Sequence, residues 1–318
     1  MVLNYSRVKA SLEDLVIFRD ERLPVRRIPL REKPLRRYFL PYRGLLGLLL
    51  IAIAWPLSQQ ITQNVFFPLW LGFILVVDGL VLRRTATSLL VRSPKIMAVM
   101  FILPYWWLFE GINQITQNWV YVGTKTDEGL ISYFEATLSY STVIPAVFEV
   151  SELVGSFGFI ERFARLRAFV LSQRQMIFTS IFGVVSLAAM LIWPTYLFPL
   201  TWLSFFFIFD PINSLAGRPS IISQMRKGDY RIVVAFALGA LVCGFFWEMW
   251  NRDASVAWEY NIGYLDFARI FEMPLLGYGG YLPFGLETYA VFHFVAGVLG
   301  WSSEAKIPLR GEPRVSSA

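Results

Sequence analysis

Eight apolar stretches separated by short loops constrain this sequence more than any other feature. They cover residues 43–58, 65–82, 96–112, 131–155, 176–194, 197–213, 231–250 and 281–301. A helix needs about 20 mostly apolar residues to cross a bilayer. Charged residues make up 16% of the chain, against about 25% in soluble domains. We therefore predict an all-α, polytopic integral membrane protein with about eight transmembrane helices.

The basic residues predict the orientation. When the N-terminus is placed in the cytoplasm, all of the 29 Lys and Arg residues except Lys125, Arg252 and Arg269 fall on the cytoplasmic side. Such an excess marks cytoplasmic loops. We expect a cytoplasmic membrane, most simply a bacterial one, with both termini in the cytoplasm. The net charge of +6 then indicates contact with anionic lipid headgroups rather than with nucleic acid.

The predicted organisation has five parts. They are a cytoplasmic basic arm over 1–42 with an interfacial helix that starts near Ser11, a first four-helix unit over 43–160, a cytoplasmic linker over 161–175, a second four-helix unit over 176–301 and a cytoplasmic tail over 302–318.

The two four-helix units carry the same motifs in the same order, which predicts an internal duplication. The pairs are Trp55-Pro56 with Trp193-Pro194, Phe67-Pro68 with Phe198-Pro199, Asp78 with Asp210, Glu110-x-x-Asn113 with Glu248-x-x-Asn251, Trp119-x-Tyr121 with Trp258-x-Tyr260, and Pro145-x-x-x-Glu149 with Pro283-x-x-x-Glu287. Each unit has an even number of spans, so both insert in the same direction. We therefore predict parallel repeats related by an axis along the membrane normal.

Carboxylates inside the spans are the main candidates for function. A charge at bilayer depth is costly, so acidic residues are rare there and often mark functional sites. The candidate acids are Glu110, Glu149, Glu152, Glu248 and Glu287. Asn113 and Asn251 follow two of them at a spacing of three residues, which places acid and amide on one helix face. One interpretation is structural, with hydrogen bonds between helices or to chain ends. The other is a reaction site with positioned acids.

Other polar residues in the spans favour structural roles. Asp210 precedes Pro211, which predicts a helix end where the carboxylate satisfies backbone groups. His293 is interpreted as a packing residue, with a pigment-metal ligand or a proton relay as the alternative. Cys243 is interpreted as a small packing residue.

The aromatic residues around Trp119, Tyr121, Trp258 and Tyr260 have two interpretations. They form an aromatic belt at the external membrane boundary, or they line a site for an apolar substrate or a cation.

Several site types are excluded. One Cys and one His exclude zinc sites built from these residues and a disulfide framework. The sequence also lacks a Gly-rich phosphate loop, G-x-S-x-G, H-E-x-x-H and a D-x-x-x-D motif for Mg-diphosphate. We predict no metal and no cofactor.

The second half of each unit resembles the membrane lycopene cyclases, which occur as heterodimers or fused duplicates. The resemblance rests on Trp119-Val-Tyr121, Gly123 and Pro145-Ala-Val-Phe-Glu149 in the first copy, and on Trp258-Glu-Tyr260, Gly263 and Pro283-Phe-Gly-Leu-Glu287 in the second. The family has two adjacent glutamates soon after the proline. Here each copy has one glutamate four residues after it, and the first copy adds Glu152.

The resemblance implies a cyclase that acts on a hydrophobic polyene or isoprenoid by carboxylate acid–base chemistry. Glu149, Glu152 and Glu287 would be the first acid–base candidates, and Glu110 and Glu248 the second. The two Asn residues and the two W-x-Y elements would bind substrate. The main alternative is a non-catalytic lipid- or pigment-binding or scaffold subunit with protein partners in a larger membrane complex. A proton-coupled transporter is a third hypothesis.

Overall fold

The computed structural model describes residues 41–60, 65–103, 105–123, 129–263, 267–301 and 307–310. All of them belong to one unit of the chain, Phe39–Ala318. The predicted interfacial helix, nearly all of the basic arm over 1–42 and most of the tail over 302–318 lie outside the described residues.

The described part is mostly helical, which confirms the coarse fold prediction. The first half contains α2 (Tyr42–Ser58), α3 (Phe66–Thr85), α4 (Leu89–Arg92), α5 (Pro94–Ile102), α6 (Tyr105–Thr116), β1 (Trp119–Val122), α7 (Leu130–Tyr140), α8 (Val143–Gly155) and η2 (Gly158–Phe163). The second half contains α9 (Gln173–Ile192), α10 (Pro194–Leu197), η3 (Phe198–Leu200), α11 (Thr201–Leu215), α12 (Ile221–Met225), α13 (Arg231–Asn251), β2 (Ala257–Tyr260), β3 (Arg269–Ile270), β4 (Met273–Pro274), η5 (Gly277–Gly280) and α14 (Tyr281–Val298).

Five helical segments of the described chain are long and apolar enough to cross a membrane. They are Phe66–Thr85, Pro94–Thr116, Gln173–Ile192, Pro194–Leu215 and Arg231–Asn251. The helix Tyr42–Ser58 is apolar but shorter. These segments are consistent with an integral membrane protein.

The predicted span 131–155 is not one helix, because the chain turns at Ser141 and Thr142 between α7 and α8. Both hydroxyls donate hydrogen bonds to backbone carbonyls of the preceding turn, at 2.6 Å to Leu138 and 2.7 Å to Ser139. Pro145 follows in the next turn and has no N–H to donate to the carbonyl of Ser141. Local hydroxyl–backbone bonds of this kind compete with helix continuation.

The prediction that Asp210 ends a helix is wrong, because α11 continues through Pro211 to Leu215. Helices in a bilayer tolerate internal proline. The expected backbone contact is nevertheless present. The carboxylate accepts hydrogen bonds from the backbone N–H of Ile221 at 2.7 Å and of Ile222 at 2.9 Å, and so caps the start of α12.

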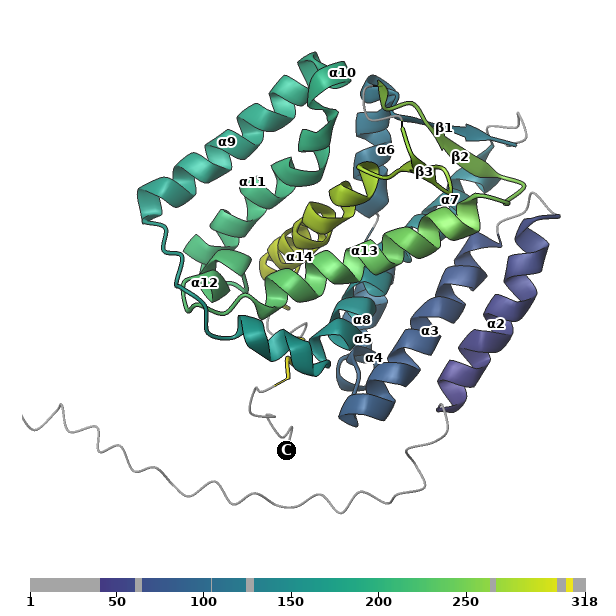
Figure 1. Cartoon of the computed structure of the whole chain (residues 1–318), viewed down its shortest axis with the longest axis horizontal. Coiled ribbons are helices and arrows are strands. Elements are labelled where there is room, and N and C mark those ends of the chain that lie inside the picture. The colour runs from purple at the N-terminus through teal and green to yellow at the C-terminus, as the bar shows by residue number, and fades with distance from the viewer. Residues whose placement is uncertain are drawn as a thin grey trace, which may run out of the picture. The chain divides into compact units, whose positions relative to one another are not determined.

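Each half of the chain contains a pair of closely packed helices. Figure 1 shows α2 beside α3 and α9 beside α11, with α8, α13 and α14 between these pairs. Glycine allows the close approach in both pairs. A Cβ on Gly47 would collide with the backbone oxygen of Gly72, and a Cβ on Gly183 would collide with the backbone of α11 at Ser204 and Ile208.

A short antiparallel pairing of β1 with β2 joins the halves at the end where α6 and α13 finish. Trp119 pairs with Tyr260, and Tyr121 pairs with Trp258. The Trp of each W-x-Y element therefore faces the Tyr of the other. Two copies of one element related by a two-fold axis would pair in this register.

Candidate ligand cavity

Two buried asparagines fix the W-x-Y elements to the helices that precede them. Asn113 accepts hydrogen bonds from the backbone N–H of Asn118 at 2.9 Å and of Trp119 at 3.2 Å, and its amide donates to the carbonyl of Trp119 at 2.8 Å. Asn251 exchanges two such bonds with the backbone of Trp258, both at 2.7 Å. The amide side chains thus tie the last turn of α6 and of α13 to the strand that follows each helix.

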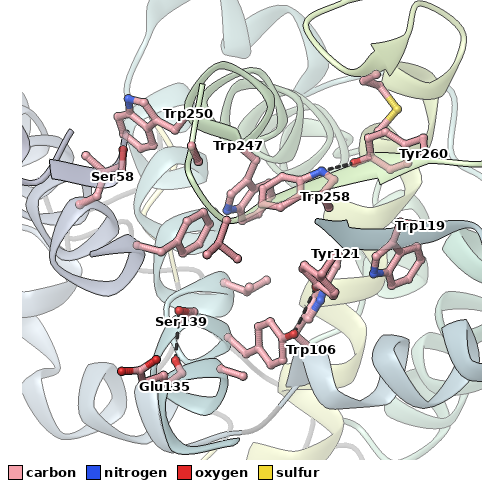
Figure 2. A pocket seen from close by; sticks show the side chains of 18 of the residues that line it. Ser58, Trp106, Trp119, Tyr121, Glu135, Ser139, Trp247, Trp250, Trp258 and Tyr260 are labelled. Carbon is pink, nitrogen blue, oxygen red and sulfur yellow. Dashed lines mark hydrogen bonds between the residues drawn. The ribbon is translucent and has the colours of Figure 1, made fainter. Parts of the chain in front are cut away.

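The strands lie against a cavity of about 1270 Å³ that is lined by residues from both halves. This volume exceeds the range of about 300–1,000 Å³ that is usual for small-molecule sites. Thirteen of its 32 described lining residues are aromatic, and Figure 2 shows part of this wall. The aromatic lining consists of Phe66, Trp106, Trp119, Tyr121, Tyr140, Phe198, Trp202, Trp247, Trp250, Trp258, Tyr260, Tyr281 and Phe284.

The four aromatic residues singled out from the sequence, Trp119, Tyr121, Trp258 and Tyr260, all line this cavity. Their position favours the interpretation as an aromatic lining over a belt that only faces lipid. The two asparagines do not contribute to the lining among the described residues. They position the lining instead, because their side chains hydrogen-bond to the backbone of the two tryptophans.

Glu110 lies directly behind the wall in the first half. It is buried, and its Oε1 accepts a hydrogen bond from the hydroxyl of Tyr121 at 2.6 Å and from the indole N–H of Trp106 at 2.7 Å. The indole of Trp119 donates to the same oxygen at 3.4 Å. Three hydrogen-bond donors thus converge on one oxygen of this buried carboxylate.

Glu248 occupies the matching place in the second half. Its Oε1 accepts hydrogen bonds from the hydroxyls of Tyr281 at 2.6 Å and Tyr260 at 2.7 Å. The indole of Trp258 donates to the Tyr260 oxygen at 2.9 Å, which Figure 2 shows as a dashed line. The other oxygen, Oε2, is buried without a hydrogen-bond partner among the described residues. Each half therefore places a carboxylate behind a phenol that faces the cavity.

The phenols of the two strands stay protonated near neutral pH. Burial, followed by the proximity of Tyr140 and Glu110, holds the pKa of Tyr121 well above its ordinary value. Burial, followed by the charge of Glu248, does the same to the pKa of Tyr260. Both hydroxyls thus keep the proton with which they hydrogen-bond to the adjacent carboxylate.

The other three candidate acids, Glu149, Glu152 and Glu287, do not line the cavity in the described part of the chain. Glu152 forms a two-pronged ion pair with Arg92, with N–O distances of 3.1 and 3.2 Å. The carboxylates of Glu149 and Glu287 are fully buried, with backbone groups of Leu90 beside the first and of Phe205 and Phe206 beside the second. The geometry thus separates these acids from the Glu110 and Glu248 sites.

His293 and Cys243 lie in apolar packing. The ring of His293 contacts Tyr289, with centroids 4.3 Å apart, and Phe292 at 5.5 Å. Cys243 is buried as a free thiol. Across the described ranges, no group of three or more His, Cys, Asp or Glu residues is placed to hold a metal ion.

Three residues that line the cavity were not predicted from the sequence: Tyr281, Tyr140 and Glu135. Tyr281 is the first residue of α14 and belongs to neither W-x-Y element, so the motif pairs gave no reason to select it. Tyr140 hydrogen-bonds to the Tyr121 hydroxyl at 3.2 Å from another helix. Glu135 could have been found, because it is also an acid inside a predicted span.

No protein-family model, curated protein or solved structure matches this chain. Its function is therefore argued from the cavity and from the two carboxylate–phenol pairs behind its wall.

Proposed function

We propose that the chain is an integral protein of a bacterial cytoplasmic membrane, with eight crossing segments arranged as two parallel four-helix units and both termini in the cytoplasm. The one-sided distribution of basic residues and the five long apolar helices support this topology. The matching glycine contacts, the two asparagine clamps and the symmetric strand register support the duplication. Exposed apolar side chains on α9, among them Phe178, Phe182 and Val185, would face lipid.

The proposed activity is the binding and cyclisation of a hydrophobic polyene or isoprenoid in the aromatic cavity. The observation that carries it is the repeated pair of a buried glutamate and a cavity-lining tyrosine, Glu110 with Tyr121 and Glu248 with Tyr260. A large aromatic cavity suits a long unsaturated chain, because ring faces stabilise a carbocation while the apolar wall excludes water.

The reaction balances without an oxidant or a cofactor. A proton adds to one carbon of a double bond, and the electron pair of a neighbouring double bond closes the ring. Loss of a proton from the carbon beside the cation then forms a new double bond. The product is an isomer of the substrate, and the protein supplies one acid and one base.

The two halves suit different steps of this reaction. In the structure the Tyr260 hydroxyl donates to Glu248. When Glu248 carries a proton, this hydrogen bond reverses, and Tyr260 passes its hydroxyl proton to the substrate as it receives the proton of Glu248. Glu110 suits the role of the base: the Tyr121 hydroxyl donates to its Oε1, so Tyr121 passes its proton to Glu110 as it takes up the proton that the cation releases. The proposal thus assigns acid–base chemistry to Glu110 and Glu248 ahead of Glu149, Glu152 and Glu287.

Expression in a bacterial host that accumulates lycopene tests this proposal. We expect the wild-type chain to convert lycopene into cyclic carotenes, detected by chromatography and absorption spectra of extracted pigment. The control is the same host with an empty vector. Persistence of lycopene, with the protein folded in the membrane fraction, would contradict the proposal for this substrate.

A non-catalytic lipid- or pigment-binding subunit is the second candidate. It is favoured by the position of both glutamates behind the tyrosines, where they stabilise the cavity wall without lining the cavity themselves. Co-purification of unchanged pigment with the protein would support this function.

A further inference from the structure

The linker between the two halves, residues 159–174, presents basic and apolar side chains together at the surface. Its exposed basic residues are Arg162, Arg165, Arg167 and Arg174. Its exposed apolar residues at the surface include Phe159, Leu166, Phe169 and Val170, which are 39 to 57% exposed. This mixture is typical of segments that lie on a membrane surface, where apolar side chains enter the lipid and basic ones meet the headgroups.

A second loop, residues 225–230 between α12 and α13, holds the linker in place. The backbone N–H of Leu166 donates to the carbonyl of Gly228 at 2.8 Å. A second bond runs from the N–H of Phe169 to the carbonyl of Met225 at 3.0 Å. Gly228 has a φ of 74°, and a Cβ there would collide with the carbonyl of Leu166. The linker is therefore a fixed part of the fold.

These two backbone bonds enclose three basic residues. Arg167 lies between the two donors on the linker, and Arg226 and Lys227 lie between the two acceptors on the facing loop. All three residues are exposed. The hydroxyl of Tyr230 also donates to the carbonyl of Arg167 at 3.1 Å. A backbone that is already ordered lowers the entropy cost of binding a ligand. We refer to residues 162–170 with 226–227 as the linker platform.

The acidic residues beside the platform already bind other arginines. Glu161 forms an ion pair with Arg310 at 2.7 Å, and Asp229 forms one with Arg231 at 2.6 Å. The sequence of the linker and the loop contains no other acidic residue. The platform therefore presents positive charge. Figure 1 shows this part of the chain beside α12 and the start of α13.

We propose that the linker platform binds an anionic phospholipid. Arg167, Arg226 and Lys227 hold the phosphate, and Leu166 and Phe169 contact the acyl chains. This inference rests on the proposed topology, which places the linker at the cytoplasmic leaflet, and not on the proposed cyclisation. The bound lipid bridges the linker and the loop that leads into α13, at the opposite end of α13 from the β1–β2 pair.

Short-chain lipids test this site with the full chain in an uncharged maltoside detergent. The probes are dioctanoyl phosphatidylglycerol, dioctanoyl phosphatidylcholine and glycerol 3-phosphate, and native mass spectrometry counts the molecules bound at each concentration. We expect the anionic lipid to bind about fivefold more tightly than the zwitterionic lipid or better, because one basic residue near an anionic surface contributes about this factor. Glycerol 3-phosphate at equal concentration should not displace the lipid, because it lacks acyl chains.

Variants assign the preference to the platform. Arg167→Gln with Lys227→Gln should remove most of it. The control, Arg252→Gln with Arg269→Gln, removes the same charge beyond the other end of α13 and should keep the preference. The exchange Arg167→Lys with Lys227→Arg retains both charges and should keep it as well. All four residues are exposed, so these variants should fold as the wild type does.

Equal affinity of the wild type for the two lipids would overturn the inference. The same holds for a preference that survives in Arg167→Gln with Lys227→Gln, or that the control loses to the same degree. Displacement of the anionic lipid by an equal concentration of glycerol 3-phosphate would also contradict it, because the platform would then bind a free phosphate ester as well as a lipid. None of these results bears on the cyclisation, which the conversion of lycopene tests separately.

Discussion

Glu248→Gln is expected to lower the conversion of lycopene by about a hundredfold or more, the usual effect of losing a positioned acid–base group. Glutamine keeps the shape of the side chain and still accepts hydrogen bonds from Tyr260 and Tyr281, whose hydroxyls lie 2.7 and 2.6 Å from Oε1. It removes the exchangeable acidic proton. The measurement is the rate of cyclic carotene formation in the lycopene-accumulating host, normalised to protein in the membrane.

Two further variants sharpen this prediction. Tyr260→Phe keeps the ring in the wall but removes the hydroxyl between Glu248 and the cavity, so it should lose activity to a similar degree. Glu259→Gln, on the same strand but exposed, should retain wild-type conversion. Wild-type rates in Glu248→Gln would rule out Glu248 as the acid.

Arg92→Met is expected to destabilise the protein by about 3 kcal/mol, because removing one partner of a buried ion pair leaves the other charge uncompensated. The Glu152 side chain is only 1% exposed, and its carboxylate is held by both terminal nitrogens of Arg92. The measurement is the midpoint of unfolding in mixed micelles of maltoside and dodecyl sulfate.

The double variant Arg92→Met with Glu152→Met should recover most of this loss, because an apolar pair of similar volume replaces a buried ion pair at little cost. It should also retain lycopene conversion if Glu152 is structural. Arg252→Met is the control, since the pair of Arg252 with Asp253 is exposed and 3.9 Å long. A double variant that is no more stable than Arg92→Met would contradict the structural role.

The motif pairs in the sequence pointed to several residues that line the cavity or lie behind its wall. Glu110 and Glu248 occur 138 residues apart, and each lies behind the tyrosine of its own W-x-Y element. Motif pairs alone could not show how the two halves of the chain meet. The pairing of Trp119 with Tyr260 depends on the tertiary arrangement.

The sequence could not separate the acids by role, because all five occur in apolar stretches and look alike. Depth along a span does not say which side of a helix faces a cavity and which faces a neighbouring helix. Glu152 pairs with Arg92 from 60 residues away, a contact that no local spacing indicates. Glu135 lines the cavity, but no motif or local spacing distinguishes it from the other acids of the apolar stretches.

If the aromatic cavity is the isoprenoid site, a photoreactive isoprenoid should crosslink to the residues that line it. Geranylgeraniol with a diazirine at its chain end is irradiated with the full-length protein in maltoside detergent, and the labelled peptides are mapped by mass spectrometry. We expect label within residues 129–143, 247–260 and 277–284, and loss of this label with excess geranylgeraniol. Label confined to the exposed apolar faces of α2 and α9, and not displaced by geranylgeraniol, would contradict it.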